Sequence, residues 1–342
     1  MFFAGLYVNL ILLSNYNLQN MKSNKVILFL IIFSFFALLI CCCVFMFTLS
    51  SVPAYENDYS TQVVKSGDEM QNVAIIEING IISSQKQIDL WGNETPDMAS
   101  EIINQIDQAQ NDDDVKALLL KVNTPGGEAY ASKLIHNQLV EFKESGKPLV
   151  ALMQDTAASG GYMVSVPADE IVASEITTTG SIGVIVTGTD FEELYKKLGI
   201  KEFTVINSEG DMKVLENLED KESESYKILQ EILDDVYNDF VEMVANGRSM
   251  SKAEVIELAD GRIYSGKQAK DLGLVDELGE EKEAFDLVAS LANIDNPNFI
   301  KYENDGNPFS LYSMSLKKIL FPELSAVESK KPGLSVQYLM KI

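Results

Sequence analysis

Histidine is nearly absent from this chain of 342 residues, which contains only His136. The apolar residues around it recur at helical spacing, and His136 directly follows the buried-side residue Ile135, so we expect it on the flank of a helix. A serine–histidine triad needs an imidazole held against the serine hydroxyl as its base. The composition therefore disfavours that triad, and a serine nucleophile here would need another base. Lysine is the usual substitute, provided that burial lowers its pKa enough to keep it neutral.

Cysteine is also scarce, because the three cysteines form one triplet, Cys41 to Cys43, inside an apolar run. The rest of the chain has no thiols for a disulfide framework or for a thiolate metal site. We therefore expect no metal centre built on cysteine in the main part of the chain. The triplet itself is typical of apolar membrane-spanning sequence.

Basic residues are outnumbered, with 27 Lys and Arg against 51 Asp and Glu and a formal net charge of -24. A carboxylate excess of this size repels nucleic-acid phosphates and anionic membrane surfaces. We therefore expect no nucleic-acid partner, and we interpret the acidity as a solvated surface rather than a site for a specific cationic partner.

One long uncharged run is present, from Val26 to Leu49. As a helix it is long enough to cross a hydrocarbon core of about 30 Å, and Lys22 and Lys25 before it predict a cytoplasmic N-terminus. A cleaved signal peptide is the alternative, but the run is long for one and shows no clean small-residue cleavage site. We predict a single-pass anchor in the cell membrane, with an N-terminal extension and basic flank at 1–25 and the main domain on the extracytoplasmic side.

Beyond the anchor, residues 50–71 are polar and are predicted to be a linker. Strand and helix patterns alternate from Asn72 onwards, which is typical of an α/β domain. We place the end of that domain near residue 294, giving a domain of 72–294. Residues 295–342 contain Asn-Pro and Asp-Gly turns and scattered apolar residues, and we predict a peripheral tail of unknown role.

The most informative stretch is Thr156 to Tyr162, in which small residues surround Ser159. An apolar run from Pro148 to Met153 leads into it and predicts a buried strand. A strand that ends in a tight turn with a serine, followed by a helix, is a common way to present a nucleophile. The amide of Gly160 would then lie beside the hydroxyl and could bind an oxyanion. A plain glycine-rich turn without catalytic function is the alternative for this stretch alone.

Two further turns follow predicted strands, at Asn123–Gly127 and at Thr177–Gly183. In an open sheet such turns can meet the Ser159 turn at one edge. Gly127 could supply a second amide to the oxyanion, opposite Gly160. Simple turn chemistry explains a Pro-Gly-Gly sequence equally well when it is considered alone.

Taken together, several segments in this order and spacing resemble the bacterial signal peptide peptidase A (SppA) family, serine–lysine proteases of the Clp/crotonase superfamily. The resemblance extends from about Asn72 to Ala292 and also includes the single N-terminal anchor. The matching segments are Lys121 to Gly127, Ala157 to Tyr162, Thr179 to Val184, Asp260 to Tyr264, Gly266 to Ala269 and Leu272 to Asp276.

The resemblance implies a Clp/crotonase-like ββα spiral domain and a role for each matching residue. Ser159 matches the nucleophile, Ser181 the hydroxyl that orients the lysine, and Gly127 and Gly160 the oxyanion amides. The general base matches Lys213, which follows a Ser-Gly pattern with a slightly irregular spacing.

Lys201 is the alternative base, but it precedes the predicted strand at 203–206 instead of following it. Lys213 lies near Glu209, Asp211 and Glu216, and nearby carboxylates raise a lysine pKa. A neutral Lys213 therefore needs burial away from them. Family members form rings with active sites at subunit interfaces, and such an assembly would supply that burial.

The resemblance thus implies a membrane-anchored serine endopeptidase that degrades remnant signal peptides and other unfolded segments, acts as a homo-oligomeric ring and needs no cofactor. Two alternatives remain open. A non-catalytic relative that scaffolds membrane partners would explain the irregular match around the lysine. An acyl-CoA enzyme of the crotonase type would share the fold but would need neither the anchor nor the serine–lysine pair.

Overall fold

The structure is a computed structural model that describes residues 33–36, 59–88, 94–201, 203, 218–304 and 336–339. The chain divides into two units, Met1–Asp58 and Tyr59–Ile342. In the first unit the described residues form one helical turn at 33–36. Within the described part of the chain, no helix combines the length and the apolar character needed to cross a membrane. Most of the predicted anchor at 26–49 lies outside that part and stays a prediction.

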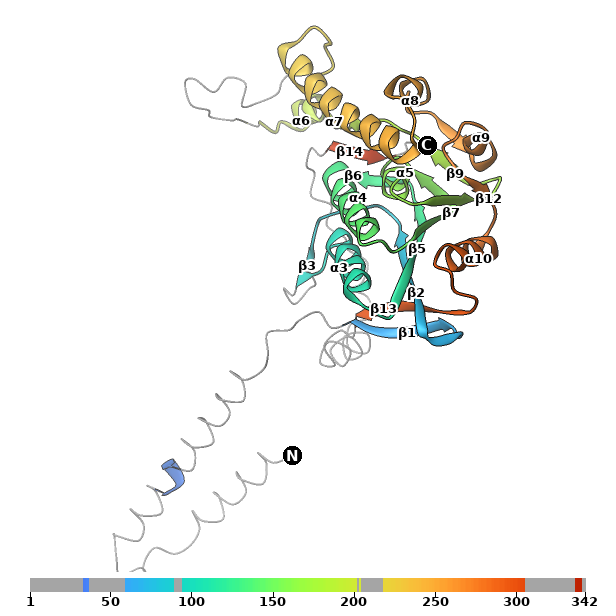
Figure 1. Ribbon diagram of the computed structural model, residues 1–342. Coiled ribbons are helices and arrows are strands. Elements are labelled where there is room, and N and C mark those ends of the chain that lie inside the picture. Colours follow the sequence, from blue (N-terminus) through green and yellow to red (C-terminus); the bar gives the residue numbers. More distant parts are fainter. Residues whose placement is uncertain are drawn as a thin grey trace, which may run out of the picture. The chain divides into compact units, whose positions relative to one another are not determined.

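The second unit is built on a nine-stranded sheet (Figure 1), whose inner strands are parallel to one another. The edge strand β1 is antiparallel to its neighbour. The strand order along the main path is β1 (Tyr59–Lys65), β13 (Pro297–Asn304), β2 (Asp68–Asn79), β5 (Val115–Thr124), β7 (Leu149–Ala158), β8 (Glu170–Ala173) and β12 (Glu277–Leu278).

Both faces of this sheet are covered, as strands buried on two sides require. Figure 1 shows α3 (Met98–Asn111) and α4 (Ala129–Glu144) on one side of the strands and α10 (Glu281–Leu291) on the other. On β5, Leu118 and Leu120 belong to the core on the α3 and α4 side, whereas Leu119 belongs to the core under α10. The prediction of an α/β fold is therefore confirmed.

Strand β7 changes its neighbour along its length, and this change positions the site. Its first half pairs with β8, whereas its last residues pair in parallel with β9 (Thr178–Gly180). Strand β9 in turn pairs with β11 (Ile263–Ser265). The end of β7 is therefore held between β5 on one side and β9 on the other.

The remaining described elements form two smaller sheets and five helices. A second sheet contains three strands in the order β10 (Ile185–Val186), β14 (Val336–Leu339) and β6 (Gly126–Glu128). A small hairpin pairs β3 (Gln87–Ile88) with β4 (Glu94–Thr95). The other helices are α5 (Gly160–Ser165), α6 (Glu192–Leu198), α7 (Glu224–Arg248), α8 (Lys252–Leu258) and α9 (Gly266–Asp271).

Two of the predicted domain boundaries are wrong. The linker predicted at 50–71 includes β1 and the start of β2, and the tail predicted at 295–342 includes β13 and β14. Strand β13 lies between β1 and β2 and buries Phe299 and Tyr302, so it is an integral part of the sheet. Strand β1 exposes all but its first two residues, and such an edge strand carries no strong apolar pattern.

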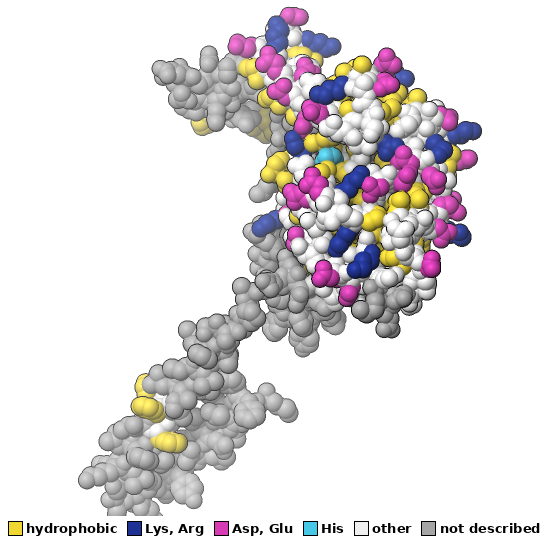
Figure 2. All heavy atoms as spheres, in the orientation of Figure 1, with side chains coloured by type: hydrophobic (Ala, Val, Ile, Leu, Met, Phe, Trp, Pro, Cys, Tyr) yellow, Lys and Arg dark blue, Asp and Glu magenta, His cyan; other side chains and the backbone are white. Residues whose placement is uncertain are grey.

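The surface carries the acidic excess in a dispersed form. Figure 2 shows carboxylates spread over the visible face with lysine and arginine side chains among them. His136 is not on a helix flank as predicted but is buried on α4, and burial lowers the pKa of its ring. The solitary histidine is thus kept neutral inside the fold.

A charged network ties β2, β5, β13 and α10 together. Glu77 accepts a hydrogen bond of 2.7 Å from Lys301 and lies 3.4 Å from the ammonium of Lys121, which also bonds Glu281 at 2.9 Å. Burial alone would raise the pKa of Glu77, but the two lysines outweigh it and hold this pKa below its ordinary value of 4.5.

We predict that this network makes stability depend on acidic pH. Because the folded pKa of Glu77 is lowered, its contribution is complete above pH 4.5 and is lost as pH falls below that value. Glu77→Gln should lower the free energy of unfolding by about 1–2 kcal/mol at pH 7. It should also make that free energy fall less steeply as the pH drops below 4.5. Urea unfolding between pH 3 and pH 7 measures both effects. Glu303→Gln, at an exposed position on the same strand as Lys301, is the control, and an equal effect there would contradict the assignment.

Candidate active site

Ser159 lies at the junction of β7 and α5 in a strained backbone conformation. Its φ of 55° and ψ of -116° place a residue with a side chain outside the ordinary left-handed region. Such a conformation costs on the order of 1–3 kcal/mol and persists only where its surroundings hold it. Here the Ser159 amide donates to the Gly180 carbonyl at 2.8 Å, and its carbonyl accepts from Met163 at 2.9 Å. The turn has the geometry of a nucleophile elbow.

The hydroxyl of Ser159 is buried and has no partner within the described part of the chain. The residue is 1% exposed, and its Oγ makes no hydrogen bond to another described residue. A buried polar atom left without a partner costs about 1–3 kcal/mol, and a catalytic role is one explanation for such an atom. Strain and an unsatisfied hydroxyl thus coincide at one residue, which is what a reactive serine requires.

The two predicted oxyanion amides lie close together beside this serine. A Cβ placed on Gly160 would be 3.3 Å from the Gly127 nitrogen. The same Cβ would lie 2.5 Å from the Ser132 hydroxyl, so a side chain at Gly160 would have to displace Ser132. At Gly127 a Cβ would lie 1.9 Å from the Ile82 carbonyl oxygen. The chain therefore brings two side-chain-free positions together at the end of β7.

The direction of the Gly127 amide follows from strand geometry. Ile82 forms a parallel bridge with Gly127, in which Ile82 donates to Gly126 and Glu128 donates to Ile82, each at 2.9 Å. Because the amides of successive residues in a strand point to opposite edges, the Gly127 N–H points away from Ile82. That other edge of β6 is where a bound chain would meet the amide.

The chain itself supplies a strand at that edge. Strand β14 pairs antiparallel with β6, with Tyr338 opposite Gly127, and pairs antiparallel with β10 on its other side. The second sheet therefore holds an extended segment as its middle strand, between β6 and β10. The segment comes from the region predicted as a peripheral tail.

Ser181 follows Gly180, the acceptor for the Ser159 amide, and is therefore near the serine as predicted. It has a φ of 52°, is buried, and donates its own amide to the Arg262 carbonyl at 2.8 Å. A pocket of about 520 Å³ opens beside it, lined among others by Gln230, Asp234 and Tyr237 of α7. This open volume is next to the position that the family resemblance gives to the lysine-orienting hydroxyl.

The predicted base, Lys213, lies outside the described residues, so the structure neither places it beside Ser159 nor separates the two. Lys201, the alternative base, is described and is exposed to solvent after α6. The three predicted positions Ser159, Gly160 and Gly127 do come together, and the choice of the base stays a prediction.

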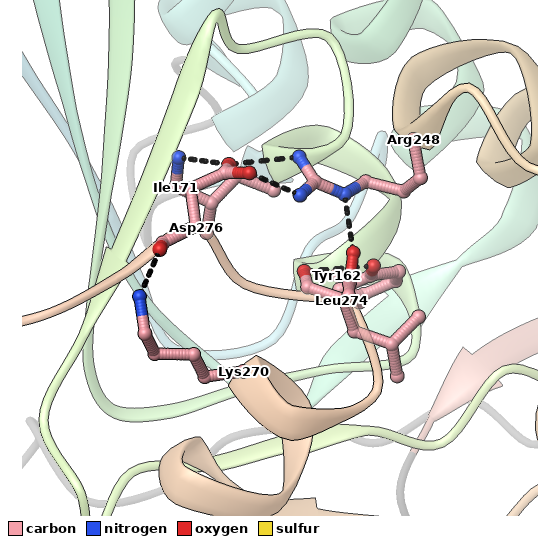
Figure 3. Close-up of polar contacts among 7 residues, drawn as sticks. Tyr162, Ile171, Arg248, Lys270, Leu274 and Asp276 are labelled. Atoms are coloured by element: carbon pink, nitrogen blue, oxygen red, sulfur yellow. Dashed lines mark hydrogen bonds and ion pairs between the residues drawn. The ribbon is translucent and has the colours of Figure 1, made fainter.

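A buried polar cluster that sequence reasoning missed holds α5 in place (Figure 3). The Tyr162 hydroxyl, fully buried on α5, donates to the Leu274 carbonyl at 3.0 Å. Arg248, at the end of α7, donates to the Gly273 carbonyl at 3.1 Å and binds the Asp276 carboxylate through both terminal nitrogens. Asp276 also accepts from the Ile171 amide at 2.8 Å. The Leu272–Asp276 segment belongs to the family match, but its sequence does not reveal these partners.

The geometry of this site and the similarity to known proteins together show the family to which the chain belongs. A buried serine on a strained strand-to-helix turn, with two glycine positions close together beside it, is typical of the serine hydrolases. The family model described as Peptidase family S49 matches residues 141–295. An Enterococcus faecium protein named as a signal peptide peptidase SppA is 36% identical over 255 residues, covering 74% of this chain and 73% of that protein. The chain belongs to this family of peptidases and is a serine protease.

Other relatives are longer. Protease 4 of Haemophilus influenzae is 34% identical over 69% of this chain but only 38% of its own length. The chloroplastic serine protease SPPA of Arabidopsis thaliana is 33% identical over 65% of this chain and 32% of its own length. A solved structure of a ClpP1 point mutant from Listeria monocytogenes aligns with 61% of this chain and 93% of its own at 14% identity and a TM-score of 0.40. That score is too low to define the fold, so the spiral Clp/crotonase topology stays a prediction.

Proposed function

We propose that this serine protease is a membrane-anchored endopeptidase that degrades remnant signal peptides and other unfolded segments. Ser159 is the nucleophile, Lys213 the general base, and Ser181 the hydroxyl that orients the lysine. The amides of Gly127 and Gly160 form the oxyanion hole. Support comes from the strained, unpaired Ser159 and from the family to which the chain belongs.

In the proposed reaction, neutral Lys213 takes the proton of Ser159 as its Oγ attacks a peptide carbonyl carbon. The carbonyl oxygen becomes an oxyanion and is stabilised by the two glycine amides. Lys213 then gives the proton to the leaving amine, which breaks the peptide bond and leaves an acyl-enzyme. Water, deprotonated by the same lysine, hydrolyses the ester and frees Ser159.

The observation that carries the choice of an extended peptide as substrate is the position of β14. Residues 336–339 lie antiparallel on β6, with Tyr338 opposite Gly127, where a substrate carbonyl must meet the oxyanion amide. An edge that pairs with a strand of this chain can pair with another extended peptide through the same backbone groups. A folded protein has no free extended strand for such pairing unless it unfolds locally, which favours unstructured substrates.

The location and the assembly are proposed on sequence grounds. The run Val26–Leu49 would anchor the chain once, with its N-terminus cytoplasmic and its protease domain on the extracytoplasmic side, next to signal peptides left in the membrane. A homo-oligomeric ring would bury the 204–217 region that contains Lys213. The exposed apolar side chains Phe191, Leu194 and Leu198 on and beside α6 support a contact with another copy.

Active-site labelling of the full chain in detergent micelles tests this function. The chain should cleave an apolar signal-sequence peptide, and a fluorophosphonate probe should stop cleavage while modifying Ser159, as mapped by mass spectrometry. A medium-chain acyl-CoA is the comparison substrate and should not be hydrolysed. Failure both to cleave peptides and to react with the probe would favour the scaffold alternative, and turnover of the thioester alone would favour the acyl-CoA alternative.

A further inference from the structure

We infer that Glu128 is a positioning residue that holds the oxyanion strand β6 in register for catalysis. The inference rests on the proposed function, because it concerns the Gly127 amide of that same site. Glu128 directly follows Gly127, and its carboxylate binds the segment that runs beside β6. No motif in the sequence assigns it a role.

The contacts of Glu128 form a clamp across two segments far apart in sequence. One carboxylate oxygen accepts from the Ser83 hydroxyl at 3.1 Å, and the other accepts from the Ser84 amide at 2.9 Å and the Ser84 hydroxyl at 2.6 Å. The Ser83 carbonyl in turn accepts from the Ala99 amide at the start of α3, at 3.2 Å. The 82–84 segment is therefore fastened to β6 and to α3.

Glu128 is the N-cap residue of α4, but glutamate is not among the residues that usually cap a helix through the side chain. Its carboxylate makes no capping bond to α4. Among the described residues it accepts from Ser83 and Ser84, so the side chain serves the clamp and not the helix end.

The clamp acts on the site through Ile82. With 82–84 held in place, Ile82 pairs with β6 on both sides of Gly127, and its carbonyl oxygen lies where a Gly127 side chain would be. This closes one edge of β6 and directs the Gly127 N–H toward the opposite edge, where β14 pairs. Without the carboxylate, the hydrogen bonds left between the two described segments are the two backbone bonds of Ile82, so this edge of β6 is held less firmly. A displacement of about 1 Å at an oxyanion donor can cost about 100-fold in rate.

The test compares Glu128→Ala with Glu128→Gln in the full chain. We expect kcat on a cleavable peptide to fall about 10- to 100-fold in Glu128→Ala with KM nearly unchanged. The inhibition constant of a peptide aldehyde, whose adduct places an oxyanion at Gly127, should rise by the same factor. Glu128→Gln keeps an oxygen acceptor for Ser84 and should recover most of the activity.

The dissociation constant of an uncleaved peptide, measured in a Ser159→Ala background, should be the same with and without Glu128→Ala. Glu144→Ala, an exposed glutamate at the other end of α4, is the matched control and should leave kcat unchanged. If Glu128→Ala fails to fold, the double variant Ser83→Ala/Ser84→Ala replaces it in the kcat measurement. That variant weakens the clamp from the other segment and should lower kcat in the same way.

The positioning role would be overturned if kcat were unchanged in the folded variants, or if the inhibition constant of the peptide aldehyde did not change with kcat. In either case, peptide cleavage by the wild-type chain would still support the proposed function. A wild-type chain that cleaves no peptide and does not react with the aldehyde would instead refute the proposed function.

Discussion

Ser159→Ala is expected to abolish peptide cleavage without destabilising the fold. Loss of the nucleophile should reduce kcat at least about 10⁴-fold, since the remaining groups can only bind the substrate and stabilise an oxyanion that water would have to form. Alanine keeps the Cβ and hence the backbone strain, but removes a buried hydroxyl that has no partner among the described residues. The free energy of unfolding should therefore be unchanged or higher by about 1 kcal/mol.

The matching control is Ser165→Ala, at the end of the same short helix. Its hydroxyl donates to the Gly161 carbonyl at 2.8 Å and lies one helical turn beyond the proposed reaction centre. We expect it to retain activity within a few-fold and to lose a little stability. Peptide cleavage and thermal unfolding measured on both variants separate chemistry from folding. Substantial cleavage by Ser159→Ala would require another nucleophile and would refute the proposed mechanism.

The sequence predicts those parts of the fold whose buried residues form a pattern that can be recognised within the segment itself. Strand β5 is buried almost throughout because both of its faces are covered, and its sequence has an apolar centre, whereas α7 shows a single apolar face. The strands β1 and β13 escaped prediction because their pairing depends on residues distant along the chain. Strand β1 is mostly exposed, and β13 begins at Pro297 in a stretch that has the composition of a turn. Neither local sequence identifies the neighbouring strand with which it pairs.

The candidate site divides in the same way. Ser159 and its glycines stand out because small residues beside a serine after an apolar run are locally unusual. The dihedral strain at Ser159 and the roles of Glu128 and Arg248 depend on partners that are distant along the chain, 44 residues away for Ser84 and Glu128. A single sequence does not connect such pairs, so side chains that hold the site are harder to predict than side chains that react.

The base is expected to be the group with the second largest effect, and it can be identified by comparing two lysines. Lys213→Met should reduce kcat about as much as Ser159→Ala, because without a base the serine keeps its proton and remains a weak nucleophile. Lys201→Met should leave kcat within a few-fold of wild type, since Lys201 is exposed to solvent. Methionine approximates the length of lysine without its charge, so the comparison tests the amine rather than the bulk.

The pH dependence of kcat/KM then shows whether the amine acts as a base. A lysine that must be neutral gives a rate that rises with pH up to its own pKa and then levels off. Burial in the proposed ring would lower that pKa, whereas Glu209, Asp211 and Glu216, which are close in sequence, would raise it. We expect the rise to be present in wild type and Lys201→Met and to be absent from the residual activity of Lys213→Met. A rise that survives in Lys213→Met but disappears in Lys201→Met would transfer the role to Lys201, because the titrating amine must be the one that takes the proton of Ser159.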